Sequence, residues 1–282
     1  MFDSIVENMI EKSKSTIPKN EGDYVGEDGL LYCGKCHTKK QTEIEVFGQK
    51  RHPYCLCKCE AEKKDEEEKM RKHREFQGQV KRMRQTGFPE SDMASWTFEN
   101  DDMANGAITQ AMRSYVANFK DFCRTGKGLL LWGNPGTGKT YAACEVANAL
   151  IDDGYPVLVT NFARLTNTLQ GMYEGKQDYI DGLNRFALLV IDDLGAERKT
   201  EFMQEMVWNI IDSRYRAGLP MIVTTNLSIE EIKKPDNVGV GRIYDRILER
   251  CHPINVKGGS RRKKTAGAEY HKMQKILGLS NE

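Results

Sequence analysis

The sequence predicts a doubly wound, parallel α/β sheet that is preceded by a small cysteine-rich module. Three observations lead to this fold class. Apolar runs of strand length alternate with segments of helical periodicity from Leu129 onwards, a pattern typical of a parallel sheet with helices on both faces. The first of these runs ends in a glycine-rich turn, and five of the eight cysteines lie within residues 33–59.

The composition restricts the classes of protein to which the chain can belong. Its 42 basic and 41 acidic side chains nearly cancel, so a nucleic-acid surface would have to be a local patch. No apolar stretch approaches the ~20 residues of a membrane span, and the start of the chain, MFDSIVENMIEKSKS, lacks the pattern of a secretory signal. We expect a cytoplasmic protein with no membrane partner, whose residues 1–17 form an amphipathic helix through Phe2, Ile5 and Met9.

The clustered cysteines indicate a metal site. Cys33 and Cys36 form a C-x-x-C pair, and Cys57 and Cys59 form a tighter pair about twenty residues later. Two such pairs supply the four thiolates of a tetrahedral Zn²⁺ site, because each pair fixes two ligands and the intervening loop folds between them. A reducing compartment favours metal over disulfides. We therefore predict that these four cysteines bind zinc in a module spanning residues 1–60.

Three further side chains leave the ligand set open. Cys55 alternates with Cys57 and Cys59, so all three could share one side of an extended strand. His37 or His52 could replace one thiolate. The preferred set remains Cys33, Cys36, Cys57 and Cys59.

A charged segment follows the cysteines. From Glu60 to Gln85, acids precede bases by four residues, the favourable order on a helix, and Gly87 and Pro89 end the pattern. We predict a solvated helical linker over residues 61–87 and a large domain over residues 88–282. The basic end of the linker, at Lys81, Arg82 and Arg84, gives a weaker case for nucleic-acid contact.

The large domain opens with turn-rich sequence and a helical pattern. Phe88, Trp96 and Phe98 are apolar anchors that favour core packing over stacking on a base. Residues 108–122 carry apolar side chains at helical spacing, which predicts one helix.

The stretch LLLWGNPGTGKTYAACEVANAL, residues 129–150, is a strand, a phosphate-binding loop and a helix. Its glycines let backbone N–H groups surround phosphate oxygens at a helix N-terminus, whose dipole favours anions. Lys139 would reach the outer phosphates, and the Thr140 hydroxyl would bind Mg²⁺. The predicted nucleotide-binding residues are Gly133, Asn134, Pro135, Gly136, Thr137, Gly138, Lys139, Thr140 and Tyr141.

Two later strands end in polar residues. A strand at residues 155–161 is followed by a helix through Met172, and the next apolar run ends in Asp192 and Asp193. Because ligands collect at the carboxyl ends of parallel strands, Asp192 would hold Mg²⁺ and Asp193 would polarise an attacking water. Asn226, which follows a strand at residues 220–225, is placed to orient that water.

The C-terminal part contains a row of arginines. Arg242, Arg246 and Arg250 lie four residues apart and form either a solvated face or a donor surface for a neighbouring subunit's γ-phosphate. A last strand is expected at residues 252–257. After it, GGSRRKK at residues 258–264 is expected to be a basic, flexible turn before a terminal helix.

Taken in order, GNPGTGKT, LLVIDDLGAE, IVTTNL, GRIYDRILERC and a closing SRR resemble the AAA+ ATPases of the DnaC/DnaI helicase-loader family, over residues 86–282. The front module resembles the partner-binding region of DnaI-like and phage-encoded loaders. The resemblance implies Walker A and B roles for Lys139, Thr140, Asp192 and Asp193, and a first-sensor role for Asn226. It also implies an arginine finger, acting in trans in a homo-oligomer, from Arg242 or Arg246, and a second sensor at Arg262.

The implied function is ATP-dependent loading of the replicative DNA helicase hexamer onto single-stranded DNA during replication initiation. The implied cofactors are ATP, Mg²⁺ and Zn²⁺. DNA contact is expected to involve the backbone, through residues 261–264. The alternatives are an IstB-like transposition helper and an adaptor that binds ATP without hydrolysing it.

The sequence departs from the AAA+ pattern in two respects. Most AAA+ enzymes have Glu where this chain has Asp193, so we expect slow hydrolysis, with Glu197 as a candidate helper. The short C-terminus implies a helical lid reduced to about one helix.

Overall fold

The computed structural model describes residues 20–102, 105–195, 200–235, 237–277 and 279. The amphipathic helix predicted for residues 1–17 and the candidate helper Glu197 lie outside this set. The chain divides into two units, the first ending at Phe76 and the second beginning at Gln77. Within the described ranges, no helix is both long and apolar enough to cross a membrane.

The first unit contains two small antiparallel sheets. Strands β1 (Tyr24–Val25) and β2 (Leu31–Tyr32) pair with each other, as do β3 (Ile44–Val46) and β4 (Gln49–Arg51). Lys40, which follows β2 and precedes β3 in the chain, is fully buried, and its Nζ is 2.8 Å from Asp23 Oδ2 and 3.1 Å from Glu60 Oε1. A buried ammonium group requires such carboxylate partners. This ion-pair network therefore joins the start of the module to the helix that follows it.

Helix α2 (Lys58–Gly87) is continuous over the whole predicted linker. Its last turns are not solvated as expected, because Val80 is buried and Met83 packs against the core of the second unit. Arg84 Nη2 donates to both carboxylate oxygens of Asp152, at 2.5 and 2.6 Å. The C-terminal part of α2 is therefore a structural element of the second unit.

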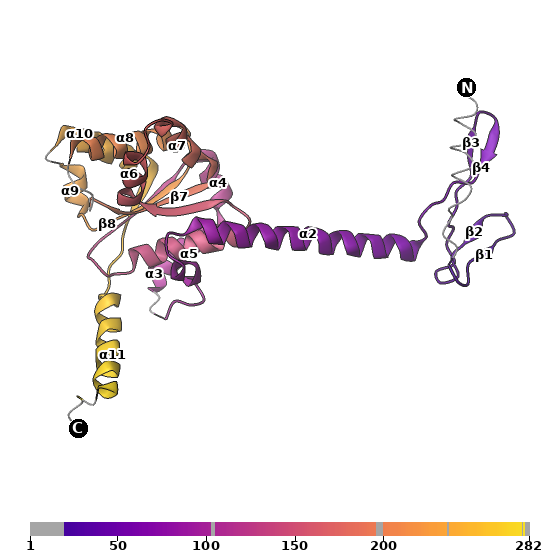
Figure 1. Ribbon diagram of the computed structural model, residues 1–282, viewed down its shortest axis with the longest axis horizontal. Coiled ribbons are helices and arrows are strands. Elements are labelled where there is room, and N and C mark those ends of the chain that lie inside the picture. Colours follow the sequence, from indigo (N-terminus) through magenta and orange to yellow (C-terminus); the bar gives the residue numbers. More distant parts are fainter. Residues whose placement is uncertain (1–19, 103–104, 196–199, 236, 278, 280–282) are drawn as a thin grey trace. The chain divides into compact units, whose positions relative to one another are not determined.

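The second unit is built on a five-stranded parallel sheet (Figure 1). The strand order is β6-β7-β8-β5-β9. The strands are β5 (Gly128–Trp132), β6 (Val157–Asn161), β7 (Leu188–Leu194), β8 (Met221–Thr225) and β9 (Cys251–Asn255). The predicted doubly wound α/β fold is confirmed.

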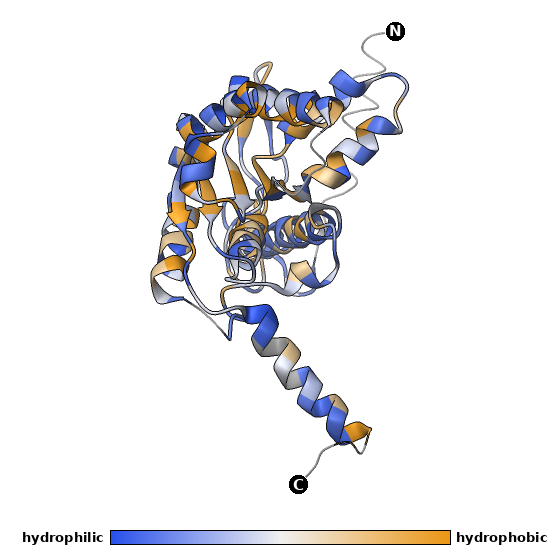
Figure 2. Ribbon diagram, turned by 90° about the vertical axis from the view of Figure 1, so that its left-hand side faces the viewer, coloured by the Kyte–Doolittle hydropathy of each residue, from blue (hydrophilic) through white to orange (hydrophobic). Residues whose placement is uncertain are grey.

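Side-chain alternation divides the core between the two faces of the sheet. Leu129 and Leu131 of β5 pack with α3 (Gly106–Ala117), α4 (Phe119–Thr125) and α5 (Lys139–Asp152) on one face. Leu130 packs on the other face, as the period of two in a strand requires. Figure 2 shows the apolar strands enclosed by helices whose outer faces are hydrophilic. The helices of the second face are α6 (Phe162–Gln170), α7 (Lys176–Gly182), α8 (Glu201–Arg216), α9 (Ile229–Lys233) and α10 (Val238–Arg250).

Two local predictions differ from the structure. The single helix expected over residues 108–122 is interrupted at Asn118, which caps the end of α3 and precedes α4. The basic turn expected before the terminal helix is wrong, because Arg261 already begins α11 (Arg261–Ile276). Ser260 is the N-cap of α11, and its Oγ accepts a hydrogen bond from the Lys263 N–H at 3.3 Å.

Candidate nucleotide-binding site

The glycine-rich loop joins the carboxyl end of β5 to the N-terminus of α5. Gly133, Gly136 and Gly138 have φ angles of 140°, 84° and 98°, in the left-handed region that disfavours side chains. A Cβ on Gly133 would lie 2.8 Å from the Val256 carbonyl oxygen. The spacing seen in the sequence therefore corresponds to a tightly curled loop that only glycine permits at these positions.

Lys139 is buried at the first position of α5. Its Nζ donates to the carbonyl oxygens of Gly133 and Asn134, both at 2.9 Å, and to Asn226 Oδ1 at 2.7 Å. Burial lowers the pKa of Lys139, while Asp193 and Asp192 oppose this effect. A cation held here, beneath a loop of backbone N–H groups, suits a polyphosphate.

Asp192 and Thr140 form the second part of the site. The Thr140 hydroxyl donates to Asp192 Oδ1 at 2.8 Å, and the Thr224 hydroxyl donates to the same atom at 2.5 Å. Burial raises the pKa of Asp192, and the hydrogen bonds from Thr224 and Thr140 oppose the rise. Hydroxyl and carboxylate oxygens are the ligands that Mg²⁺ takes in proteins, so this pair fits a magnesium ion beside bound phosphates.

Asp193 has an unusual backbone conformation. Its φ is 55°, which costs a non-glycine residue about 1–2 kcal/mol. The pairing of β7 with β8 shifts register between Ile191 and Leu194, and the Asp193 N–H donates to Thr224 Oγ1 at 3.0 Å. This bulge turns the Asp193 carboxylate toward Asn226, whose Nδ2 is 3.5 Å from Asp193 Oδ1.

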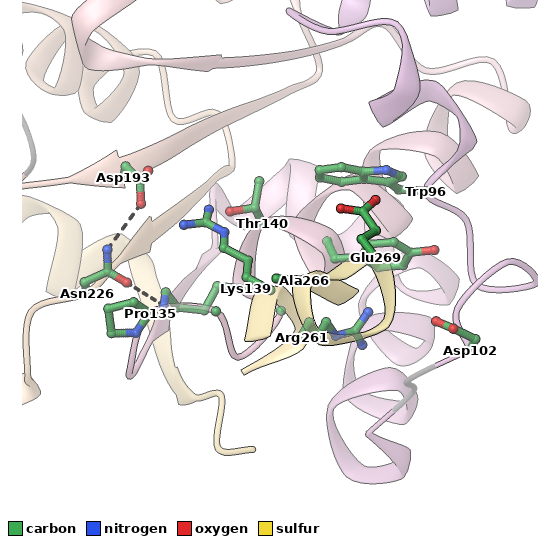
Figure 3. Close-up of a pocket in the computed structure, with 14 residues that line it drawn as sticks. Trp96, Asp102, Pro135, Lys139, Thr140, Asp193, Asn226, Arg261, Ala266 and Glu269 are labelled. Carbon is green, nitrogen blue, oxygen red and sulfur yellow. Dashed lines mark hydrogen bonds between the residues drawn. The ribbon is translucent and has the colours of Figure 1, made fainter. Parts of the chain in front are cut away.

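Lys139, Thr140, Asp193 and Asn226 line a cavity of about 520 Å³, whereas Asp192 is not one of its lining residues. The size suits a small ligand. Figure 3 shows Asp193, Asn226 and Lys139 linked along one side, with Trp96, Glu269 and Arg261 farther along the cavity. The predicted residues that line it are Pro135, Gly136, Gly138, Lys139, Thr140, Tyr141, Asp193, Asn226 and Arg262. Gly133, Asn134 and Thr137 belong to the loop but are not lining residues.

Five lining residues were not predicted as site residues: Trp96, Asp102, Arg261, Ala266 and Glu269. Trp96 packs against the core as expected, and it also stacks on Tyr141 with ring centroids 5.3 Å apart and planes at 15°. No motif surrounds Trp96 in the sequence. The sequence does give a signal for Arg261, because it directly precedes Arg262, which was predicted to contact the nucleotide.

Residues 62–268 match the family of IstB-like ATP binding proteins. The chain belongs to this family. This IstB-like protein is 30% identical over 190 residues to the replicative helicase loader DnaI of Bacillus subtilis, a match covering 61% of this chain and 60% of DnaI. It is 27% identical over 185 residues to a putative insertion sequence ATP-binding protein of Sinorhizobium fredii, with coverages of 63% and 59%.

A solved structure gives the same fold. A crystal structure of DnaI matches with a TM-score of 0.52 at 23% identity, covering 60% of this chain and 95% of that chain. The predicted resemblance to AAA+ helicase loaders is therefore confirmed at the level of family and fold. The IstB-like chain spans about 60% of the length of the two relatives described above.

The arginine row lies on α10 of the IstB-like domain, and its members have different surroundings. The Arg246 guanidinium lies 4.0 Å from the Trp208 ring centroid and pairs with Asp212. Arg250 lies over the Tyr215 ring at 4.6 Å and donates to backbone carbonyls. Arg242 is exposed and makes no hydrogen bond or ion pair within the described part of the chain. Of the two candidates for the arginine finger, Arg242 is thus the one that is exposed and has no such contact within the described residues.

Four thiols converge in the first unit of the IstB-like chain. The sulfur atoms of Cys33, Cys36, Cys57 and Cys59 all lie within 4.8 Å of one another, the one such metal-ligating group among the described residues. Four sulfurs at this separation fit a tetrahedral Zn²⁺ site. Cys57 and Cys59 lie around the start of α2 and do not share an extended strand with Cys55.

The alternative ligands lie elsewhere. Cys55 Sγ is 3.7 Å from the Lys39 carbonyl oxygen. His37 Nδ1 is 3.3 Å from the Tyr24 hydroxyl, and His52 Nε2 is 3.4 Å from Glu43. None of the three belongs to the thiol cluster.

Proposed function

We propose that the protein is an ATP-dependent loader of the replicative DNA helicase, placing the helicase hexamer on single-stranded DNA. The observation that carries this proposal is the thiol-cluster unit, which precedes the family match at residues 62–268. A metal-bound module separate from the nucleotide site would give the ATPase a surface for recruiting another protein. The relative DnaI is itself named a replicative helicase loader.

The nucleotide site supports slow ATP hydrolysis. In this proposal Lys139 binds the outer phosphates, and Thr140 and Asp192 hold Mg²⁺. Asp193 and Asn226, whose Oδ1 and Nδ2 atoms are 3.5 Å apart, orient the attacking water. Asp193 has one methylene fewer than the glutamate usual in AAA+ enzymes, which draws its carboxylate back from that water.

A neighbouring copy of the chain completes the site. Arg242 would supply positive charge to the γ-phosphate in trans, so the active species is a homo-oligomer. Since bound ATP then holds subunits together, its main role is to control assembly.

Zinc in the first unit would position the helicase-binding surface. The four thiolates fix the ends of a loop that carries β3 and β4, and in a module this small the metal supplies much of the folding free energy. Loss of zinc should therefore abolish partner binding and leave the nucleotide site intact.

A pull-down of the hexameric replicative helicase, with and without ATP, tests the proposal. The full-length protein should retain the helicase, and Cys33→Ser should lose it. Cys55→Ser is the matched control, because Cys55 lies outside the thiol cluster, and it should bind as well as the native chain. Equal helicase binding by Cys33→Ser would overturn the role of the first unit.

Turnover is measured separately. Steady ATP hydrolysis that rises with single-stranded DNA and disappears in Lys139→Ala is the expected result, and it would exclude an adaptor that only binds ATP. Absence of turnover in the presence of helicase and DNA would favour the adaptor.

A transposition helper is the second candidate, favoured by the family name and by the insertion sequence relative. It predicts ATP-dependent filaments on duplex DNA and no retention of helicase. Binding to both DNA forms should fall steeply with salt if contact is through the phosphate backbone.

A further inference from the structure

The N-terminus of α11 is attached to two distant segments of the second unit. Arg261 Nη1 and Nη2 donate to Asp101 Oδ1 and Oδ2, at 2.8 and 2.9 Å. The Asp101 side chain is 2% exposed and the Arg261 side chain 18%. The Arg261 guanidinium also lies 4.7 Å from the centroid of the Tyr141 ring. A bidentate pair of this kind, largely removed from water, fixes direction as well as distance.

Arg261 lies directly on the phosphate-binding loop. Its backbone N–H donates to the Gly136 carbonyl oxygen at 2.8 Å. A Cβ on Gly138 would be 2.6 Å from Arg261 Nε, and one on Gly136 would be 2.4 Å from Ser260 Oγ. The start of α11 is therefore in contact with the two loop glycines that surround the phosphate position.

The next residue has a different environment. Arg262 is exposed, lines the nucleotide cavity and makes no hydrogen bond or ion pair within the described ranges. Successive residues on an α-helix are rotated by about 100°. Because Asp101 fixes the orientation of Arg261, it also fixes the side of α11 from which Arg262 projects into the cavity.

We propose that Asp101 is a positioning residue for nucleotide recognition, which acts by fixing the rotation of α11 so that Arg262 reaches the terminal phosphate of ATP. Arg261 and Arg262 then have separate roles: Arg261 attaches the helix, and Arg262 contacts the ligand. This inference rests on the proposed binding of ATP in the cavity.

The test compares ATP and ADP affinities of the full-length protein by calorimetry with Mg²⁺, in the native chain, Asp101→Asn, Arg262→Ala and the double variant. We expect each single variant to lower ATP affinity about tenfold and to change ADP affinity little. The double variant should be no worse than Arg262→Ala, because both changes remove the same contact. Glu99→Gln, on the same segment but exposed, is the control and should match the native chain.

Three outcomes would overturn the inference. The first is an equal loss of ATP and ADP affinity in Asp101→Asn. The second is a loss of ATP affinity in the double variant that equals the product of the two single-variant losses. The third is an Arg262→Ala protein that binds ATP as tightly as the native chain. If Asp101→Asn does not fold, Arg261→Gln removes the same ion pair from the other side and is judged in the same way. A native protein that binds neither nucleotide would instead refute the proposed ATP binding, so the two failures are distinguishable.

Discussion

The buried Glu145 should make the stability of the second unit depend on pH. Glu145 lies on α5, is 2% exposed, and has one carboxyl oxygen without a hydrogen-bond partner. Burial raises its pKa from 4.5 to about 7; the neighbouring Asp101 adds to this effect, and the positive charges of Arg261 and Arg113 oppose it. Between pH 4.5 and about pH 7, Glu145 is therefore protonated in the folded protein and ionised in the unfolded chain.

Proton linkage gives the direction and size of the change in the free energy of unfolding. Since the folded state holds more protons between pH 4.5 and 7, the free energy of unfolding falls as pH rises through this window and stays low above it. At about 1.4 kcal/mol per pH unit, the full effect is on the order of 3 kcal/mol. Glu145→Gln replaces the carboxyl by a neutral group that can still donate to Asp101, so it should remove this pH dependence.

Urea unfolding followed by tryptophan fluorescence measures the effect, because all three tryptophans lie at positions 96, 132 and 208 in the second unit. The variant and the native protein should be nearly equally stable at pH 4, and the variant should be more stable by about 3 kcal/mol at pH 8. Glu99→Gln is the exposed control. A stability difference that is the same at both pH values would refute the reasoning.

Four further predictions concern the metal, Arg242, Arg246 and Asn226. Mass spectrometry should find one zinc per chain in Cys55→Ser and none in Cys33→Ser. The melting of both variants, followed by tryptophan fluorescence, should stay unchanged. Zinc retained by Cys33→Ser would contradict the predicted ligand set. Arg242→Ala should lower ATP turnover about 10³-fold without changing the melting temperature. Mixing Arg242→Ala chains with Lys139→Ala chains should restore ATP turnover. Absence of this rescue would exclude donation in trans. Arg246→Ala should instead cost about 2 kcal/mol of stability, and unchanged stability would contradict its packing role. Asn226→Ala should slow turnover about 10²-fold with ATP affinity nearly unchanged, so parallel loss of affinity would show that it binds ligand rather than orienting water.

Local patterns account for the features that the sequence predicted. Four of the five strands of the sheet are short, largely apolar runs, and the loop glycines lie where a left-handed backbone is needed, so each is specified by its immediate neighbours. The thiol cluster follows the same rule, since each cysteine pair fixes two ligands locally. Asp193 was predicted by its place at a strand end, but its bulge depends on pairing with β8 and was not evident from sequence.

Features that depend on long-range contacts were not predicted. Asp101 and Arg261 are 160 residues apart, and no periodicity relates them. Trp96 looked like a core residue and is one, but only the fold brings its ring onto Tyr141 at the cavity. The role of a polar or aromatic side chain at this site is thus decided by which distant segment packs beside it.

The surroundings of the three arginines on α10 are also decided by a distant segment of the chain. Three arginines at equal spacing on α10 are equivalent in the sequence, yet α8 distinguishes them, because Trp208, Asp212 and Tyr215 take up Arg246 and Arg250. An arginine held between aromatic rings and a carboxylate cannot reach another subunit without losing those contacts. Arg242 is exposed and makes no hydrogen bond or ion pair within the described part of the chain. If the ATP site is shared between subunits as proposed, we expect Arg242 to be the donor, because the contacts within its own subunit leave it exposed, whereas the spacing alone does not distinguish it.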